Sequence, residues 1–259
     1  MSLRPTTSGY LGFGSIVIPV RIYSASEDVR LHLPRVHTDD NGAVIRQEVC
    51  ATCGKVLHTE DISKVYDVPT GEVKMDENGE LSSTSHPVMF KDEEFKAFKA
   101  PASKQIRLVG FCDRREIDDL ILDKPHFVGT GTKKEGGFQS FVLLREAMVK
   151  AGKVAIISWT SRGESYVGMM TPYGKGFLLK KLLYFDEARS VDDVSIEDAP
   201  VNPALVEKAV KLVEKLTAQF DHSQYTDKYA EDVRKFVTAR IEGIAPEPVI
   251  ETAVAKEVS

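Results

Sequence analysis

The chain has 259 residues, of which 42% are hydrophobic, enough for the core of one large domain or two small ones. No run of 18 or more apolar residues occurs, and the first residues lack the apolar stretch of a signal peptide, so we expect no membrane span and a cytoplasmic location. Two of the three cysteines form a Cys-x-x-Cys pair, which is typical of a reducing compartment.

Charge is distributed unevenly along the chain. The net charge is −5, but residues 101–185 carry 14 basic against 8 acidic side chains. Residues 186–259 carry 9 basic against 16 acidic ones. Because the local field governs attraction to a polyanion more than global charge does, the acidic total does not exclude nucleic-acid binding. A mildly basic, solvated side of an ordinary domain is the alternative interpretation.

The first half of the chain predicts β-structure. Gly9, Gly12 and Gly14 allow the backbone either to turn or to approach a neighbour closely before an apolar, β-branched run at 15–23, which predicts a strand. Pro19 cannot donate to a strand ladder, so it predicts an edge or a bulge there. Alternation predicts a second strand at 29–36, and residues 67–104 predict an extended excursion with short strands.

The middle of the chain alternates between strand patterns and one clear helix. Three strands separated by turns at 161–164 and 172–176 predict a β-meander, which suits a barrel or a curled sheet. In chain order the predicted elements are a strand at 104–112, a helical turn at 113–122, a strand at 127–130, a helix at 138–150 capped by Gly152, and strands at 154–160, 165–171 and 177–185.

The last third predicts two helices. Asn202 followed by Pro203 is a typical helix start, and an apolar stripe runs from Leu205 to Phe220. Thr226 is the predicted cap of a second helix, which ends near Ile241. Residues 244–259 predict a short flexible tail.

The Cys50-Ala-Thr-Cys53-Gly54 turn is the strongest chemical signal. Two thiolates at this spacing on a tight turn fit half of a zinc site, and His37 is the predicted third ligand, with His32 and His58 also nearby in sequence. A thiol pair without metal remains an alternative, and so does a redox pair, although no strand-to-helix context follows it.

Sequence motifs of catalysis are scarce, so we expect no enzymatic activity. No nucleophile elbow, metalloprotease helix or dinucleotide loop is present, and the stretch from Gly168 to Gly176 has the wrong spacing for a phosphate loop. The basic meander can instead contact DNA phosphates without sequence-specific contacts to bases. The alternative is a solvated strand face.

Several motifs together resemble the bacterial Ku family. The opening contains Ser8-Gly9, Phe13-Gly14, Ile18-Pro19-Val20 and Tyr23-Ser24-Ala25 at family spacings. Further matching segments follow in family order, namely the Cys-x-x-Cys-Gly turn, Asp123-Lys124-Pro125, the helix around Leu143 to Ala147, the strand from Gly152 to Ile156, Arg162-Gly163, and Phe220-Asp221 with Tyr225.

The resemblance implies an α+β fold that is mostly β. Residues 1–36 and 101–190 would form a Ku-like β-barrel, and residues 37–100 a bridge arm similar to a zinc ribbon. Residues 191–243 would form a helical dimerisation arm, followed by the tail at 244–259. Zinc is the one cofactor that this arrangement would accommodate, through Cys50, Cys53 and His37.

The resemblance also implies a function in DNA double-strand break repair. A homodimeric ring would bind double-stranded DNA ends independently of sequence and recruit an ATP-dependent DNA ligase of the ligase D type for non-homologous end joining, at the nucleoid. The residues predicted to contact DNA are Arg21, Arg35, Arg46, Lys55, Lys124, Lys133, Lys134, Lys153, Arg162, Lys180 and Lys181. The alternative is a dimeric, zinc-ribbon-containing adaptor that binds no DNA ends.

Overall fold

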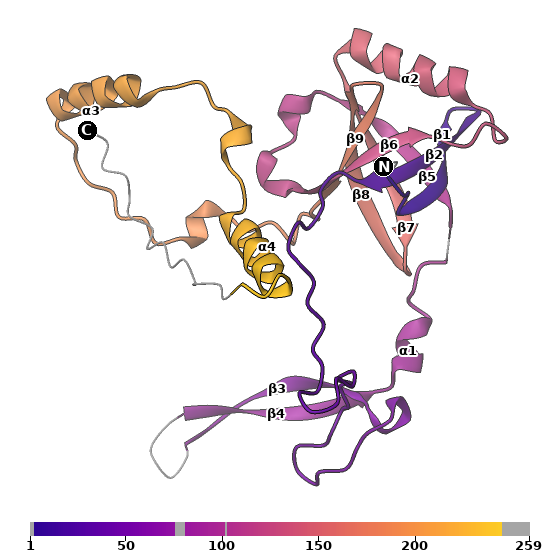
Figure 1. Ribbon diagram of the computed structural model, residues 1–259, viewed down its shortest axis with the longest axis vertical. Helices are drawn as coiled ribbons and strands as arrows, with labels where there is room; N and C mark the ends of the chain where they lie inside the picture. The colour runs from indigo at the N-terminus through magenta and orange to yellow at the C-terminus, as the bar shows by residue number, and fades with distance from the viewer. Residues whose placement is uncertain (1–2, 76–80, 102, 245–259) are drawn as a thin grey trace. The chain divides into compact units, whose positions relative to one another are not determined.

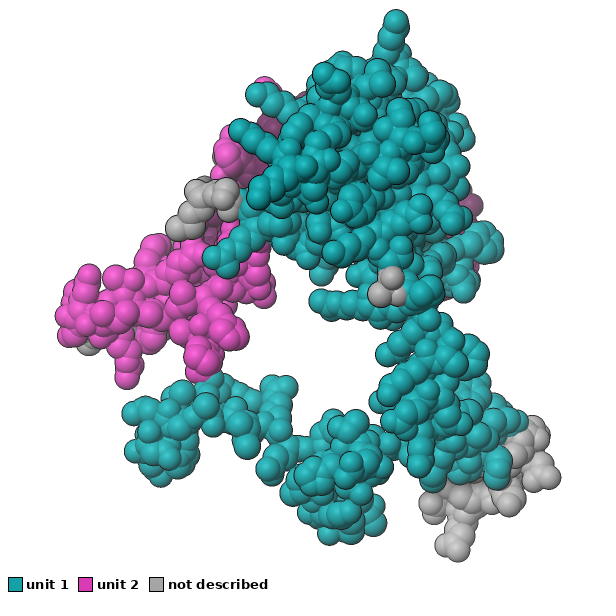
Figure 2. Space-filling model, turned by 90° about the vertical axis from the view of Figure 1, so that its right-hand side faces the viewer, with its two compact units in different colours: residues 1–26, 35–188 teal, residues 27–34, 189–259 magenta. Residues whose placement is uncertain are grey.

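The computed structural model describes residues 3–75, 81–101 and 103–244. The chain divides into two compact units, one made by residues 1–26 and 35–188 and the other by residues 27–34 and 189–259 (Figure 2). Apart from Ile244, the predicted tail lies outside the described residues. Within the described part, every helix is too short or too polar to cross a membrane.

A closed seven-stranded barrel dominates the first unit (Figure 1). Its neighbouring strands are antiparallel except for the first and last in the order, β1 and β5, which pair in parallel. The order is β1 (Thr7–Phe13), β2 (Ile16–Ser24), β6 (Leu122–Thr130), β9 (Gly176–Leu182), β8 (Glu164–Tyr173), β7 (Val154–Ser161) and β5 (Gln105–Cys112). The predicted barrel and its β7–β8–β9 meander are therefore confirmed.

The glycine-rich opening is itself a strand, so of the two alternatives a turn does not form at Gly9, where the backbone instead approaches Lys104 closely. β1 and β2 pair in an unbroken register from Thr7 opposite Ile22 to Phe13 opposite Ile16, so the bulge predicted at Pro19 is wrong. Pro19 instead lies just beyond the last pair between β2 and β6, and its carbonyl accepts a hydrogen bond from the N–H of Gly131 at 2.9 Å. No strand there needs the N–H that proline lacks.

Helix α2 (Phe138–Ala151) covers one end of the barrel (Figure 1). It begins after Gly137 and ends at Gly152, both with left-handed backbone. Its buried face includes Phe141, whose ring meets Phe177 edge-on at 5.0 Å between centroids. This contact belongs to a continuous core inside the barrel, to which β1, β2 and β5 to β9 all contribute.

A second apolar cluster lies on the other side of strands β7 to β9. Two short 3-10 turns, Arg114–Glu116 and Asp119–Ile121, lead into it, and Ile117 packs there with Val154, Met169 and Leu182. These turns match the predicted helical turn at 113–122. The cluster buries strand residues that point away from the barrel interior, so the meander is apolar on both faces.

The segment between β2 and β5 is less regular than the barrel. A 3-10 turn at Thr59–Asp61 precedes a long hairpin of β3 (Lys64–Met75) and β4 (Leu81–Phe90), which replaces the predicted short strands, and α1 (Asp92–Lys96) follows. The strand predicted at 29–36 does not form.

The second unit contains α3 (Pro203–Leu216), α4 (Lys228–Ile241) and 3-10 turns at Val191–Asp193 and His222–Gln224. Asn202 caps α3 as predicted, and its side chain accepts a hydrogen bond from the N–H of Ala204 at 2.9 Å. The cap of α4 is Asp227 rather than Thr226, and Asp227 also contacts Arg30 at 3.4 Å. Residues 27–34 therefore belong with α4.

Barrel closure predicts a strict need for glycine at position 9. A Cβ there would lie 2.5 Å from the Lys104 carbonyl oxygen, just where the Tyr10 N–H donates to that oxygen at 2.8 Å. We expect Gly9→Ala to lower the free energy of unfolding by about 1–3 kcal/mol in denaturant titration. Gly12→Ala on the same strand is the control, because its Cβ would meet nothing closer than 4.0 Å. Equal stability of the two variants would contradict this account of closure.

Candidate nucleic-acid interface

The end of the barrel opposite α2 is open and forms a cavity of about 440 Å³, here called the barrel mouth. It lies where β6 and β8 begin and where β2, β7 and β9 end. Three of the predicted DNA-binding residues line it together, namely Lys124, Arg162 and Lys181. His126, Trp159 and Tyr166 also line it.

Strand alternation directs Lys181 toward this mouth, which Lys124 also lines. Lys181 is paired with Gly168 on β8, and it shares the inward face of β9 with Leu179, which is buried in the barrel core. On β6, His126 shares its face with Val128, another core residue, and Lys124 lines the mouth at the register shift between Leu122 and Pro125. The interior of the barrel is thus apolar in the middle and basic at its open end.

Arg162 reaches the mouth from the tight turn between β7 and β8. Ser161 pairs with Glu164, so Arg162 and Gly163 form a two-residue turn, and both have positive φ, 53° and 85°. This is the type I′ turn that matches strand twist. Arginine seldom adopts a left-handed backbone, so this turn holds an exposed cation at a conformational cost.

An aromatic pair fixes the position of Lys181. Its ammonium nitrogen lies 4.9 Å from the centroid of the Tyr166 ring, and Trp159 stacks on Tyr166 at 5.6 Å. The Tyr166 hydroxyl donates to Glu164 at 2.6 Å, and this hydrogen bond raises the pKa of Tyr166. The ring therefore stays neutral and holds the ammonium group in place by a cation–π interaction.

The cations of the barrel mouth are not neutralised by ion pairs within the described residues. Among the ion pairs of the described residues, none includes Lys124, Arg162 or Lys181. Among the described residues that line the mouth, Asp123 is the one with an acidic side chain. The mouth therefore presents an excess of positive charge to an anion.

The other predicted barrel residues lie elsewhere. Lys180 pairs with Met169, which belongs to the outer apolar cluster, so its side chain leaves β9 on the face opposite to Lys181. Lys133 and Lys134 follow the end of β6, and Lys153 precedes β7, which places these three at the α2 end of the barrel.

Two predicted DNA-binding lysines are neutralised by ion pairs. Lys153 bonds to Asp113 at 2.8 Å, which raises the pKa of Lys153 and lowers that of Asp113. Lys55 bonds to Asp61 at 3.2 Å. Both cations are less available to a phosphate than those of the mouth.

Arg21, Arg35 and Arg46 are not part of the mouth. Arg21 is half-buried on β2, opposite Ser8 and Gly129. Arg35 and Arg46 are exposed in the irregular segment that follows the first two strands. Their predicted contacts with DNA remain predictions.

Two of the predicted zinc ligands, Cys50 and Cys53, lie on one turn in the structure. Backbone N–H groups of Cys53 and Thr52 lower the pKa of the Cys50 thiol, as in a metal-binding turn. His37, however, contacts Asp40 at 2.9 Å, and within the described residues no group of three or more His, Cys, Asp or Glu side chains could hold a metal. These residues do not make a complete zinc site, and zinc binding remains a prediction.

Sequence reasoning missed His126, Trp159 and Tyr166. Each occupies an inward position of a strand near its open end, and the alternation of buried residues in β6, β7 and β8 carries that signal. Their convergence depends on the strand order β6, β9, β8, β7, which brings together residues as far apart in sequence as His126 and Tyr166.

Comparison with known proteins agrees with the barrel and its position in the chain. Residues 12–211 match the family model of the Ku70/Ku80 beta-barrel domain. The chain is 28% identical over 237 residues to the non-homologous end joining protein Ku of Bacillus subtilis strain 168, covering 90% of this chain and 71% of the relative.

Two further relatives give the same result. The non-homologous end joining protein Ku of Mycolicibacterium smegmatis is 28% identical over 93% of this chain and 72% of its own length. Protein Ku of Mycobacterium phage Omega is 29% identical over 95% of this chain and 82% of its own length. The match thus defines a Ku-type β-barrel protein. The chain belongs to the Ku family.

Neighbouring lysines on opposite faces of β9 provide a test of the mouth. We expect Lys181→Gln to weaken binding of a short duplex by about fivefold to tenfold, because a charge-assisted contact to phosphate is lost. Lys180→Gln, with the same charge change on the other face, should weaken it by less than about twofold. Fluorescence anisotropy at fixed salt measures both, and equal losses would show that the mouth has no special role.

Proposed function

We propose that this protein binds the ends of double-stranded DNA independently of sequence. The observation that carries the proposal is the convergence of Lys124, Arg162 and Lys181 at one barrel mouth. None of the three takes part in an ion pair of the described residues. Cations of this kind contact phosphates, which are the same in every sequence. The names of the relatives, which specify non-homologous end joining, agree with this class of ligand.

The mechanism needs no chemistry on the DNA. Basic side chains supply phosphate contacts, and their number rather than any single bond sets the affinity. Each contact releases counterions, so the affinity should fall steeply with salt concentration. We place this activity in the cytoplasm, on the DNA of the nucleoid.

The working form that we propose is a homodimer. Helix α3 carries a wide apolar face, and Leu205, Leu212, Val213 and Leu216 on it are each more than half exposed in the single chain. A helix with such a face gains most of its stability from packing against a partner. A second copy of the same chain would cover this face.

Two chains arranged as a ring would admit DNA only at a free end. Such a ring offers many weak phosphate contacts at once and can slide inward along the duplex without reading its sequence. We further propose that the loaded protein recruits an ATP-dependent DNA ligase of the ligase D type, which would seal the joined ends. The competing interpretation is a dimeric adaptor that does not bind DNA ends.

End dependence separates these two functions. We expect linear duplex to bind strongly and relaxed closed circular duplex of the same sequence to bind at least about tenfold more weakly in a gel-shift titration, because a closed circle has no end to thread. Linearising the circle should restore binding. Equal binding of both forms would exclude threading, and no binding of either would favour the adaptor.

The dimer proposal predicts a concentration-dependent assembly. We expect Leu212→Glu to convert the dimer to a monomer in sedimentation experiments, because a buried unpaired charge is costly at an apolar interface. Lys208→Glu places the same acid on the polar face of α3 and should leave the dimer intact. A monomeric unmodified chain, or equal behaviour of both variants, would refute assembly through α3.

A further inference from the structure

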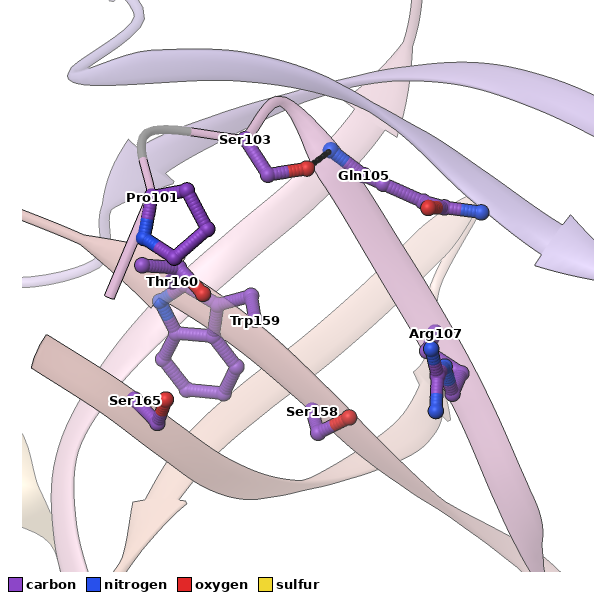
Figure 3. A pocket seen from close by; sticks show the side chains of 8 residues that line it. All are labelled: Pro101, Ser103, Gln105, Arg107, Ser158, Trp159, Thr160 and Ser165. Carbon is purple, nitrogen blue, oxygen red and sulfur yellow. Dashed lines mark hydrogen bonds between the residues drawn. The ribbon is translucent and has the colours of Figure 1, made fainter.

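A second cavity, here called the hydroxyl-lined cavity, lies beside the barrel mouth (Figure 3). It has a volume of about 210 Å³. Four hydroxyl side chains, an amide, a guanidinium and two apolar side chains line it, contributed by Ser103, Ser158, Thr160, Ser165, Gln105, Arg107, Pro101 and Trp159. Trp159 also lines the mouth, so it is a wall common to both cavities.

Strand pairing explains why these polar side chains gather. Arg107 on β5 lies opposite Ser158 on β7, and Thr160 lies opposite Ser165 on β8. Ile106 and Ile157 point the other way, into the core, which leaves Arg107 and Ser158 on the outer face of the sheet. Figure 3 shows Ser158 below Trp159, and Arg107 projecting from the neighbouring strand on the right.

The donors of this cavity suit an anion. No acidic side chain is among the residues that line it, and no ion pair among the described residues involves Arg107. The Ser103 hydroxyl oxygen accepts a hydrogen bond from the Gln105 N–H at 3.0 Å, which leaves the hydroxyl hydrogen free to donate. Arginine, hydroxyl and amide donors are the groups that proteins direct at phosphate oxygens.

The charge of the cavity distinguishes between kinds of phosphate. One guanidinium among neutral donors balances the single negative charge of a phosphodiester. A terminal phosphate monoester carries about −1.5 to −2 charges at neutral pH and would leave part of that charge unbalanced. A cavity of this size also excludes a base pair, so it would contact the backbone alone.

We propose that the hydroxyl-lined cavity seats one phosphodiester group of a DNA strand, with Arg107 as the charged contact. Neighbouring phosphates of the same strand would lie at the barrel mouth on the other side of Trp159. This inference rests on the proposed DNA binding, and it adds a contact on the outer face of β5 and β7 to those of the mouth.

Removal of the Arg107 guanidinium tests whether the hydroxyl-lined cavity binds a phosphodiester. We expect Arg107→Gln to weaken binding of linear duplex by about tenfold, equally for unrelated sequences, and to reduce the slope of log affinity against log salt by about one. Arg115→Gln is the matched control, since Arg115 is an exposed arginine in the turn after the far end of β5. Unchanged circular dichroism and melting would show that both variants are folded.

The hydroxyl groups are tested separately from the charge. Ser158→Ala should weaken binding by about twofold to fivefold without changing the salt slope, because it removes a neutral donor. Trp159 is the single tryptophan of the chain, so its fluorescence reports directly on the shared wall. We expect duplex DNA to change this fluorescence in the wild type and to change it less in Arg107→Gln.

Different phosphate sources give different outcomes. Duplexes with and without a 5′-phosphate should depend equally on Arg107, and inorganic phosphate at matched ionic strength should neither displace DNA nor alter the Trp159 signal. If the wild type binds linear DNA and the Arg107→Gln variant has the same affinity and salt slope, the proposal for this cavity is overturned. Dependence on the terminal phosphate, or displacement by inorganic phosphate, would also overturn it. Loss of the preference for linear DNA in the wild type would instead refute the proposed function.

Discussion

Closure of the barrel between β1 and β5 is the constraint on which the rest of the first unit depends. These strands pair in parallel over only three residues, and Gly9 allows the backbones to approach at the Lys104 carbonyl. Closure removes the open edge of the sheet and fixes which strand ends meet. The barrel mouth is built from strand ends that would have no common rim in an open sheet.

Strand alternation then decides which basic residues act together. A residue's position in sequence says little about its role when the next residue points to the opposite face, as with Lys180 and Lys181. The same rule places Arg107 outside the barrel beside Ile106 inside it. The barrel therefore carries two small cavities of different chemistry, the basic mouth and the hydroxyl-lined cavity, with Trp159 as their common wall.

Much of the fold could be predicted because its signals are local. The meander, α2 and α3 follow from alternation, helical periodicity and capping residues such as Asn202 and Gly152. The alternating pattern at 29–36 failed because only Val36 finds a bridge partner, and residues 27–34 instead belong to the unit of α4, where Arg30 contacts Asp227, 197 positions away.

The candidate site was predictable only in part. The lysines and arginines could be named, but their division between the two ends of the barrel required the strand order. The grouping of Lys124, Arg162 and Lys181 depends on tertiary closure, which no local pattern contains. Arg107 was not among the predicted residues, because its significance depends on the hydroxyl groups that β7 and β8 bring beside it.

The left-handed backbone of Arg162 would set thermal stability against affinity at one position in the proposed DNA complex. Asparagine or glycine would relax this turn, since both adopt positive φ more readily. Either one would also strip a cation from the rim of the barrel. If Arg162 contacts a phosphate as proposed, substitutions that relax this turn would raise stability and lower affinity for DNA.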